Sequence, residues 1–495
     1  MDSVKEEIKS GALVNFWGLL GKLAAPAFLI LVNRYYGTEL FGYYVTANMI
    51  LDIGLALLIF GFKDGIVIHV SKYAGREQGI SPLYNSIANA QLWTISAALI
   101  FILLILITGR WTFSLFYEPV FAQNLSTILY MMILATPFMA FYNIVISATQ
   151  GLKIMKYDST INGVIRPLLL LIFIISMWYI DPGLTGLAIG FLSTHVVLAF
   201  IGIYVFHKAF QWNKLLNAFR KLTVDRDLIH FALPQNLNMT LNRFITGVDV
   251  LMLPIFGVSA KQVGYYAAGS MIIREVRNVK LIFSTSFAPH IVRLFDAKKH
   301  RKLSHHFSVT AGWVSSIAIP ILLAILVLRG ELLTIINPKF SGNTWFMIGL
   351  LPVPYFYSTF SLAGNILTMT GHSKVTLFNT TVSSVFNILM NIWLIPNFNL
   401  LGAAIASSLT MLALNILELA EARYFTRARL QFSKFFFPHL CGLFALGGYL
   451  FIMANNLFTS YGEHTGNVIT LVLVLGTYGL LYFGFRKKWM GTEAG

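Results

Sequence analysis

Residues Gly42-Tyr-Tyr-Val-Thr-Ala-Asn-Met-Ile-Leu-Asp52 return as Gly264-Tyr-Tyr-Ala-Ala-Gly-Ser-Met-Ile-Ile-Arg274, 222 positions further along the chain. Residues 143–151 match 365–371 and residues 186–190 match 402–406, at offsets between 216 and 222. Three separate matches at almost one offset indicate an internal duplication. An acid in the first copy, Asp52, occupies the place of a base in the second copy, Arg274.

Around these segments, apolar runs of about 20 residues recur along the whole chain, which is the length that a helix needs to cross a bilayer. They are continuously apolar, whereas the strands of a membrane barrel alternate. We expect an all-α, polytopic membrane protein with fourteen spanning helices. The predicted spans are 12–33, 41–62, 86–108, 126–148, 160–180, 184–206, 228–256, 263–288, 307–328, 345–370, 375–395, 401–422, 436–457 and 465–485.

The composition agrees with this class, because 57% of the residues are hydrophobic and only 11% are charged, against about 25% charged residues in soluble domains. The duplication predicts two lobes of six helices in parallel orientation, related by an axis along the membrane normal. We therefore expect an N-terminal lobe at 1–210, a cytoplasmic linker at 211–227, a C-terminal lobe at 228–430 and a two-helix appendage at 431–495.

Lys and Arg gather at both termini and in the connections after even-numbered spans, so both termini are predicted to be cytoplasmic. The net charge of +16 is then a sign of topology and of attraction to membrane lipids, and we expect no nucleic-acid partner. The chain has one cysteine, Cys441, and no HExxH pattern. We expect no metal, no cofactor and no catalytic residue.

Basic residues within the predicted spans are the strongest indication of function. Each costs about 2.5–3.5 kcal/mol at the centre of a spanning helix, so that they must face water, a counter-charge or an anionic ligand. Three acids, Asp52, Asp249 and Glu275, are available as counter-charges or as sites for coupled H⁺ or Na⁺. The excess of positive charge favours a phosphate-bearing ligand. The basic residues are Lys22, Arg166, Arg243, Arg274, Arg277 and Lys280.

Uncharged polar residues form stripes at helical spacing on several predicted spans. They fit a cavity lining and hydrogen bonding between packed helices equally well. The candidates for a lining are Asn15, Asn48, Gln235, Asn238, Asn242, Asn387 and Asn391.

The chain resembles the polysaccharide transporter branch of the MOP flippase superfamily, the Wzx-type exporters of lipid-linked oligosaccharides such as O-antigen units. The resemblance rests on Lys9-Ser-Gly-Ala-Leu-Val-Asn15, on Asn33-Arg34-Tyr-Tyr-Gly37 followed by Phe41-Gly42, on Asp52-Ile-Gly54, and on the plan of six, six and two helices. It implies alternating access by two lobes in the cell inner membrane.

The substrate that this resemblance implies is an undecaprenyl-diphosphate-linked glycan, moved from the cytoplasmic to the outer leaflet. By similarity to the related lipid II flippase, Lys22 and Arg274 or Arg277 would bind the diphosphate, and the last two helices would hold the lipid tail. The polar stripes would then face the glycan. A polysaccharide polymerase and glycosyltransferases are the implied partners.

Two other functions are weighed against this one. A multidrug exporter similar to MATE proteins shares the plan, but cationic drugs call for carboxylates rather than excess cations. A membrane glycosyltransferase or polymerase would carry catalytic acids or histidines in sizeable external loops, and the external loops predicted here are short.

Overall fold

The computed structural model describes residues 26–75, 80–340, 342, 344–458 and 461–490, and these residues form helices and no strand. The chain forms two compact units, residues 1–265 (unit 1) and 266–495 (unit 2). The predicted division into two lobes, a linker and a two-helix appendage is finer than these two units, and it stays a prediction.

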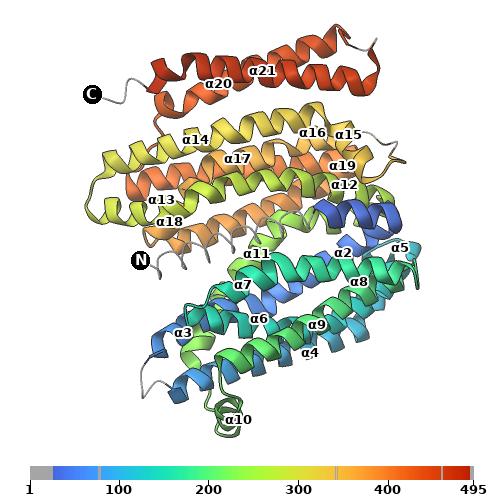
Figure 1. Cartoon of the computed structure of the whole chain (residues 1–495), viewed down its shortest axis with the longest axis vertical. Helices are drawn as coiled ribbons and strands as arrows, with labels where there is room; N and C mark the ends of the chain where they lie inside the picture. Colours follow the sequence, from blue (N-terminus) through green and yellow to red (C-terminus); the bar gives the residue numbers. More distant parts are fainter. Residues whose placement is uncertain (1–25, 76–79, 341, 343, 459–460, 491–495) are drawn as a thin grey trace, which may run out of the picture. The chain divides into compact units, whose positions relative to one another are not determined.

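Unit 1 is a bundle in which the long helices run side by side (Figure 1). Residues 26–35 are helical and precede the first labelled element. The elements that follow are α2 (Thr38–Leu55), η1 (Ala56–Phe60), α3 (Gly61–Tyr73), α4 (Ile80–Phe116), α5 (Pro119–Met132), η3 (Ile133–Ala135), α6 (Thr136–Gly151), α7 (Lys156–Thr160), η4 (Ile161–Ile165), α8 (Arg166–Trp178), α9 (Leu184–Ala209), α10 (Trp212–Arg220) and α11 (Arg226–Ile255).

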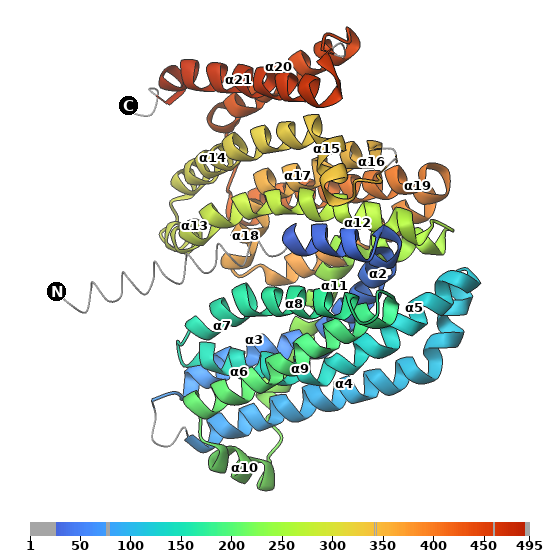
Figure 2. The same cartoon turned by 45° about the vertical axis from the view of Figure 1, so that its right-hand side comes forward.

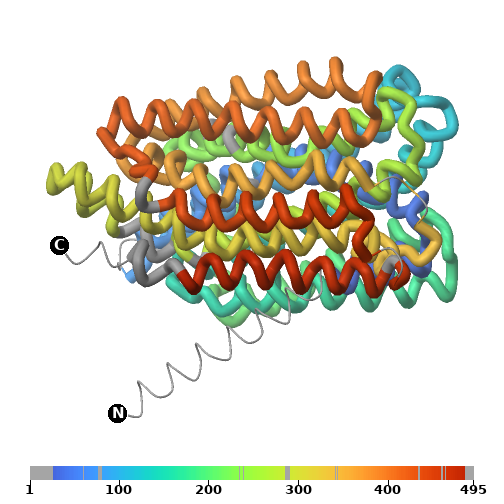
Figure 3. Tube along the Cα trace, turned by 90° about the horizontal axis from the view of Figure 1, so that it is seen from above, coloured from blue at the N-terminus to red at the C-terminus, as the bar shows by residue number. Residues whose placement is uncertain are grey.

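Unit 2 begins within α12 (Ala260–Arg274), and its long helices run roughly parallel to one another in the view of Figure 3. The further elements are η5 (Glu275–Arg277), α13 (Asn278–Asp296), α14 (His300–Val327), α15 (Arg329–Ile336), α16 (Trp345–Leu350), α17 (Pro352–Phe360), α18 (Leu362–Met369), α19 (Ser373–Thr426), α20 (Phe432–Ala454) and α21 (Glu463–Met490).

From residue 41 onward, each predicted span coincides with a helix or a succession of helices, while the first, 12–33, lies largely outside the described residues. Spans 375–395 and 401–422 are continuous as α19, apart from Asn399, whose φ of 49° and ψ of −125° break the helix. Within the described residues, nine helices, or ten with the bent α16–α18 stretch, are long and apolar enough to cross a membrane. The protein is therefore a multi-pass membrane protein, and the count of fourteen stays a prediction.

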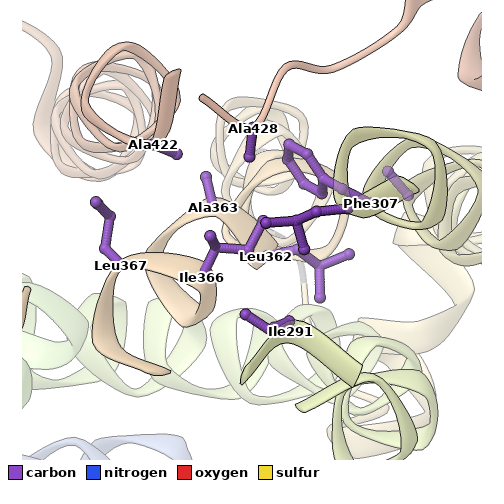
Figure 4. Close-up of a cluster of buried hydrophobic side chains, with 10 residues drawn as sticks. Ile291, Phe307, Leu362, Ala363, Ile366, Leu367, Ala422 and Ala428 are labelled. Atoms are coloured by element: carbon purple, nitrogen blue, oxygen red, sulfur yellow. The ribbon is translucent and has the colours of Figure 1, made fainter. Parts of the chain in front are cut away.

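The core of unit 2 shows how apolar faces hold this bundle together. Leu362 and Ile366 of α18 are fully buried in one cluster with Phe307 of α14 and Ile291 of α13, and Leu367 lies on the side of Ala422 (Figure 4). Leu362 and Ile366 are four residues apart and therefore share one apolar face of α18.

The segment between α9 and α11 contains the short helix α10, which crosses one end of unit 1 (Figure 2). The part of this segment that directly precedes α11 is hydrogen-bonded to α4. The amides of Asn85 and Asn89 donate to the Thr223 carbonyl at 2.9 and 2.8 Å. Asp225 caps α11 by accepting from Leu228 N at 3.1 Å, and its other oxygen accepts from Ser86 Oγ at 2.6 Å. The bond from Leu228 N satisfies an amide group that the start of α11 would otherwise leave open.

Candidate functional site

A cavity of about 370 Å³ lies within unit 1 among α2, η1, α3, α6, α7, η4, α8 and α11. Five charged side chains line it, together with two amides and three apolar residues. The lining consists of Asp52, Leu55, Ile59, Lys63, Met139, Asn143, Asp158, Asn162, Arg166 and Arg243.

The α2–α3 helix is widened at one wall of this cavity. Residues Ala56–Phe60 form a π-turn, an irregularity that is frequent at functional sites. At its end, the Gly61 N–H donates to the side-chain oxygen of Asn236 on α11, so the ladder of helical bonds is interrupted there. A Cβ atom on Gly61 would overlap the Ala232 carbonyl oxygen. Only glycine allows α3 and α11 to approach so closely.

A second π-turn, Ile161–Ile165, lies between α7 and α8, and both of these helices contribute residues to the cavity wall. It ends just before Pro167, which has no N–H and therefore cannot continue the helical bonding of the preceding turn. Asp158, Asn162 and Arg166 are spaced four residues apart and all line the cavity. Asn162 Nδ2 donates to Asp158 Oδ1 at 2.7 Å.

Charge in the cavity is mixed, with three cations and two carboxylates on its wall. The Asp52 carboxylate accepts a hydrogen bond from Asn48 Nδ2 at 3.3 Å. It also interacts electrostatically with Arg243 and Arg166. The formal excess in this cavity is one positive charge.

Other predicted site residues of unit 1 lie in varied settings. Gln235 donates to Asp64 Oδ2 at 3.1 Å, Asn242 is exposed, and Asp249 is buried at 2% exposure. Lys22, Asn15 and the side chain of Asn238 lie outside the described part of the chain.

In unit 2, Lys280 is buried within a polar network. Its ammonium donates to Ser361 Oγ at 2.6 Å and to the Ser361 carbonyl at 3.2 Å. It lies 4.6 Å from the centre of the Tyr357 ring, and it interacts electrostatically with Glu418 of α19. Glu418 is not one of the three acids that the sequence offered as counter-charges. The structure makes this acid a counter-charge for Lys280.

The remaining charged candidates of unit 2 lie near the same turn of the α12–α13 helix. The Arg277 guanidinium is 5.0 Å from the centre of the Tyr357 ring, an arrangement typical of a cation–π contact. Arg274 is half-buried, while Glu275 is exposed and accepts from Asn278 Nδ2 at 2.7 Å.

Two of the predicted polar lining residues take part in helix packing within α19. Asn387 Nδ2 donates to Thr410 Oγ1 at 3.1 Å, across the break at Asn399. Asn391 Nδ2 donates to Asn387 Oδ1 at 3.0 Å, and both asparagines are fully buried. The Asn387 amide thus joins the two helical parts of α19, and Asn391 bonds to it within the first part.

Sequence reasoning missed Lys63 and Asp158 as lining residues because the predicted spans ended at 62 and began at 160. Helical spacing contained the signal. Asp52, Ile59 and Lys63 are seven and four residues apart, and Asp158 is eight residues before Arg166, so each set shares a helix face. Among the described residues, no group of three or more His, Cys, Asp or Glu side chains could hold a metal ion.

The many apolar helices and a charged internal cavity define a multi-pass membrane protein with a transporter-like architecture. A family model described as "Polysaccharide biosynthesis protein" matches residues 9–295. Because this match covers more than half of the 495 residues, the chain belongs to the polysaccharide biosynthesis protein family. Comparison with curated protein sequences gave no match.

Solved structures with the same fold include the lipid II flippase MurJ in an inward closed conformation. It has a TM-score of 0.74 and 14% identity, covering 96% of this chain and 99% of that one. An inward-facing MATE multidrug transporter of the MOP superfamily has a TM-score of 0.68 and 13% identity, covering 83% and 95%. The MATE multidrug transporter DinF-BH has a TM-score of 0.62 and 15% identity, covering 85% and 96%. The chain thus has the fold of MOP-superfamily flippases and transporters.

Proposed function

We propose that this protein is a flippase that moves an undecaprenyl-diphosphate-linked oligosaccharide from the cytoplasmic to the outer leaflet of the cell inner membrane. It would work by alternating access, without catalysing a covalent reaction, and with both termini in the cytoplasm. The observation that carries the proposal is the cavity of unit 1, where the guanidinium groups of Arg166 and Arg243 lie on the wall with Lys63. Family membership and the fold support the same reading.

The chemistry of a diphosphate fits these groups. Arginine presents a planar set of N–H donors that matches two phosphate oxygens at once. The carboxylates of Asp52 and Asp158 would hold the cations in place while the cavity is empty. An entering diphosphate would compete with them for the arginines, and the formal excess of one positive charge in the cavity would balance part of its charge. We include Arg274, Arg277, Lys280 and Lys22 as further candidate diphosphate ligands.

The membrane potential supplies a driving force. Outward movement of about two negative charges across an inside-negative membrane is favoured by about 2.3 kcal/mol per charge per 100 mV. Coupled entry of H⁺ or Na⁺ would add to it, with Asp52, Asp249 and Glu275 as candidate sites.

Exchange of cavity arginines tests the proposal in cells. We expect Arg166→Gln and Arg243→Gln to reduce surface glycan at least tenfold, with unchanged amounts of protein in the membrane. Arg110→Gln is the matched control, because Arg110 is exposed on α4 and is not part of the cavity wall. Normal surface glycan in both cavity variants would overturn the assignment of the site.

A MATE-like drug or cation antiporter is the second candidate, and the two carboxylates on the cavity wall favour it. The same cells distinguish the two functions. A flippase leaves resistance to cationic dyes unchanged when the gene is removed. An antiporter instead gives dye accumulation in the deletion strain and normal export when the chain is restored, but not with Asp52→Asn.

A further inference from the structure

Unit 2 contains a second and larger cavity, of about 630 Å³, which the proposed transport path does not use. It lies where α15 and the residue before α16 meet the end of α20 and the first turns of α21. Figures 1 and 3 both show these helix ends at the same end of unit 2. Its volume is within the range of about 300–1,000 Å³ that is typical of small-molecule sites.

Arg329 organises one wall of this cavity. Its Nε donates to Thr344 Oγ1 at 3.1 Å, and its Nη1 donates to Tyr449 Oη at 2.8 Å and to the Leu326 carbonyl at 2.7 Å. The guanidinium therefore joins α14, α15, α20 and the residue before α16. Because both hydroxyl groups act as acceptors toward Arg329, each keeps a hydrogen that it can donate to a ligand.

Glu331 organises the facing wall. Asn467 Nδ2 of α21 donates to Glu331 Oε1, which fixes the Asn467 amide and leaves its oxygen as an acceptor. The formal charges of Arg329 and Glu331 cancel. A cavity with balanced charge and fixed hydroxyl and amide groups favours a neutral, hydroxyl-rich ligand over a phosphate or an ammonium group.

Apolar side chains complete the lining, among them Ile452, Met453 and Phe458. A sugar ring carries hydroxyl groups at its edge and C–H groups on its faces, so polar and apolar walls side by side match it. We propose that this cavity binds neutral sugar units of the translocated glycan. The inference rests on the proposed function, because that function makes a glycan the cargo. The connections that form the cavity follow odd-numbered predicted spans and are therefore outward-facing in the predicted topology.

The test uses full-length protein in nanodiscs and the water-soluble oligosaccharide released by mild acid from the lipid-linked glycans of the source cells. Binding is measured by saturation-transfer NMR and by titration. We expect Asn467→Leu to weaken binding at least tenfold and Tyr449→Phe, which removes one hydroxyl group, to weaken it about threefold. Tyr478→Phe is the matched control, since Tyr478 is a buried tyrosine of α21 whose hydroxyl donates to the Ser316 carbonyl at 3.1 Å outside this cavity.

The outcomes separate this inference from the proposed function. Loss of sugar binding in Asn467→Leu, with Arg166→Gln still binding the sugar, supports a site distinct from the cavity of unit 1. Absence of binding by the wild-type protein overturns the inference. Equal binding by the wild-type protein, Asn467→Leu and Tyr449→Phe overturns it as well. Normal surface glycan in Arg166→Gln and Arg243→Gln counts against the proposed function alone. A thermal melt of each variant identifies loss of fold, and Tyr449→Phe carries the test if Asn467→Leu does not fold.

Discussion

Gly42 of α2 lies directly against the backbone carbonyl of Ala260 in α12, so that a Cβ atom at residue 42 would overlap that oxygen. The contact is reciprocal, because a Cβ atom on Gly264 would overlap the Thr38 carbonyl oxygen. Residues 42 and 264, and residues 38 and 260, are the duplicated counterparts at the offset of 222. Two helices that cross closely at these corresponding glycines produce such a pair of contacts. All four residues belong to unit 1.

This crossing predicts that neither glycine accepts a side chain. Gly42→Ala and Gly264→Ala each force a methyl group against backbone, and we expect each to lower the free energy of unfolding by about 2–4 kcal/mol through strain. Thermal melts in detergent check this. Gly447→Ala is the control, because nothing lies within 4 Å of the position that its added methyl group would take on α20, and it should be neutral or stabilising. Melting temperatures that match the control would contradict a close crossing.

The electrostatic interaction of the buried Lys280 with Glu418, which is partly buried, predicts a coupling between these two side chains. Removal of one partner, in Lys280→Met or Glu418→Gln, leaves the other charge without this counter-charge and should cost about 3–5 kcal/mol. The double variant should recover much of that loss. A double-mutant cycle by thermal or chemical unfolding measures the coupling. Additive losses would show that the two residues do not interact, and Lys280 would then remain a candidate for substrate binding alone.

The bond from Gly61 N–H to Asn236 predicts that the π-turn beside the cavity depends on α11. Asn236→Leu removes the acceptor and leaves a buried N–H group unsatisfied, which should cost about 1–3 kcal/mol. Asn397→Ala is the control, since Asn397 is exposed and bonds to the Trp393 carbonyl of its own helix. Equal melting temperatures for the two variants would mean that Asn236 does not support this turn.

The proposed topology predicts which surfaces reagents can reach in intact cells. Cys441 is the single cysteine and is buried, so its replacement by serine gives a suitable background. Asn217→Cys on α10 should be protected from a membrane-impermeant maleimide, whereas Asn455→Cys at the end of α20 should be labelled. Asn455 and Asn217 are both exposed in the structure, so burial does not explain a difference in their labelling. The reverse pattern of labelling would invert the orientation and the proposed direction of transport.

Continuous apolar runs predicted the helical class and the place of the long helices from residue 41 onward, because length and continuous apolarity are sufficient to identify a spanning helix. They did not predict the short helices α10 and α15. Periodicity did not predict the π-turn at Ala56–Phe60, since the bond that interrupts the helix comes from Asn236, 175 residues away. For the same reason, the partners of Lys280 were not predictable. Ser361 and Glu418 are brought to Lys280 by packing between α13, α17, α18 and α19.

Within the candidate site, sequence reasoning identified Asp52, Arg166 and Arg243, because charges inside apolar spans are costly and conspicuous. Lys63 and Asp158 lie close to the predicted span ends, where a charge carries no such signal. Asn387 and Asn391 were noticed in the sequence, but their role could not be decided from it. Polar residues at this helical spacing fit both a cavity lining and hydrogen bonding between packed helices. Only the contacts of these two asparagines with each other and with Thr410 assign them to helix packing.

Translocation in reconstituted vesicles tests the central claim most directly. Vesicles hold the purified protein, a fluorescent undecaprenyl-diphosphate-linked oligosaccharide and an imposed potential of about 100 mV, and a membrane-impermeant quencher reports the leaflet of the probe. We predict protein-dependent movement toward the positive side that reverses with the potential and is lost in Arg166→Gln with Arg243→Gln, but not in Arg110→Gln. Movement at the same rate in vesicles with the double cavity variant, or in protein-free vesicles, would contradict the account.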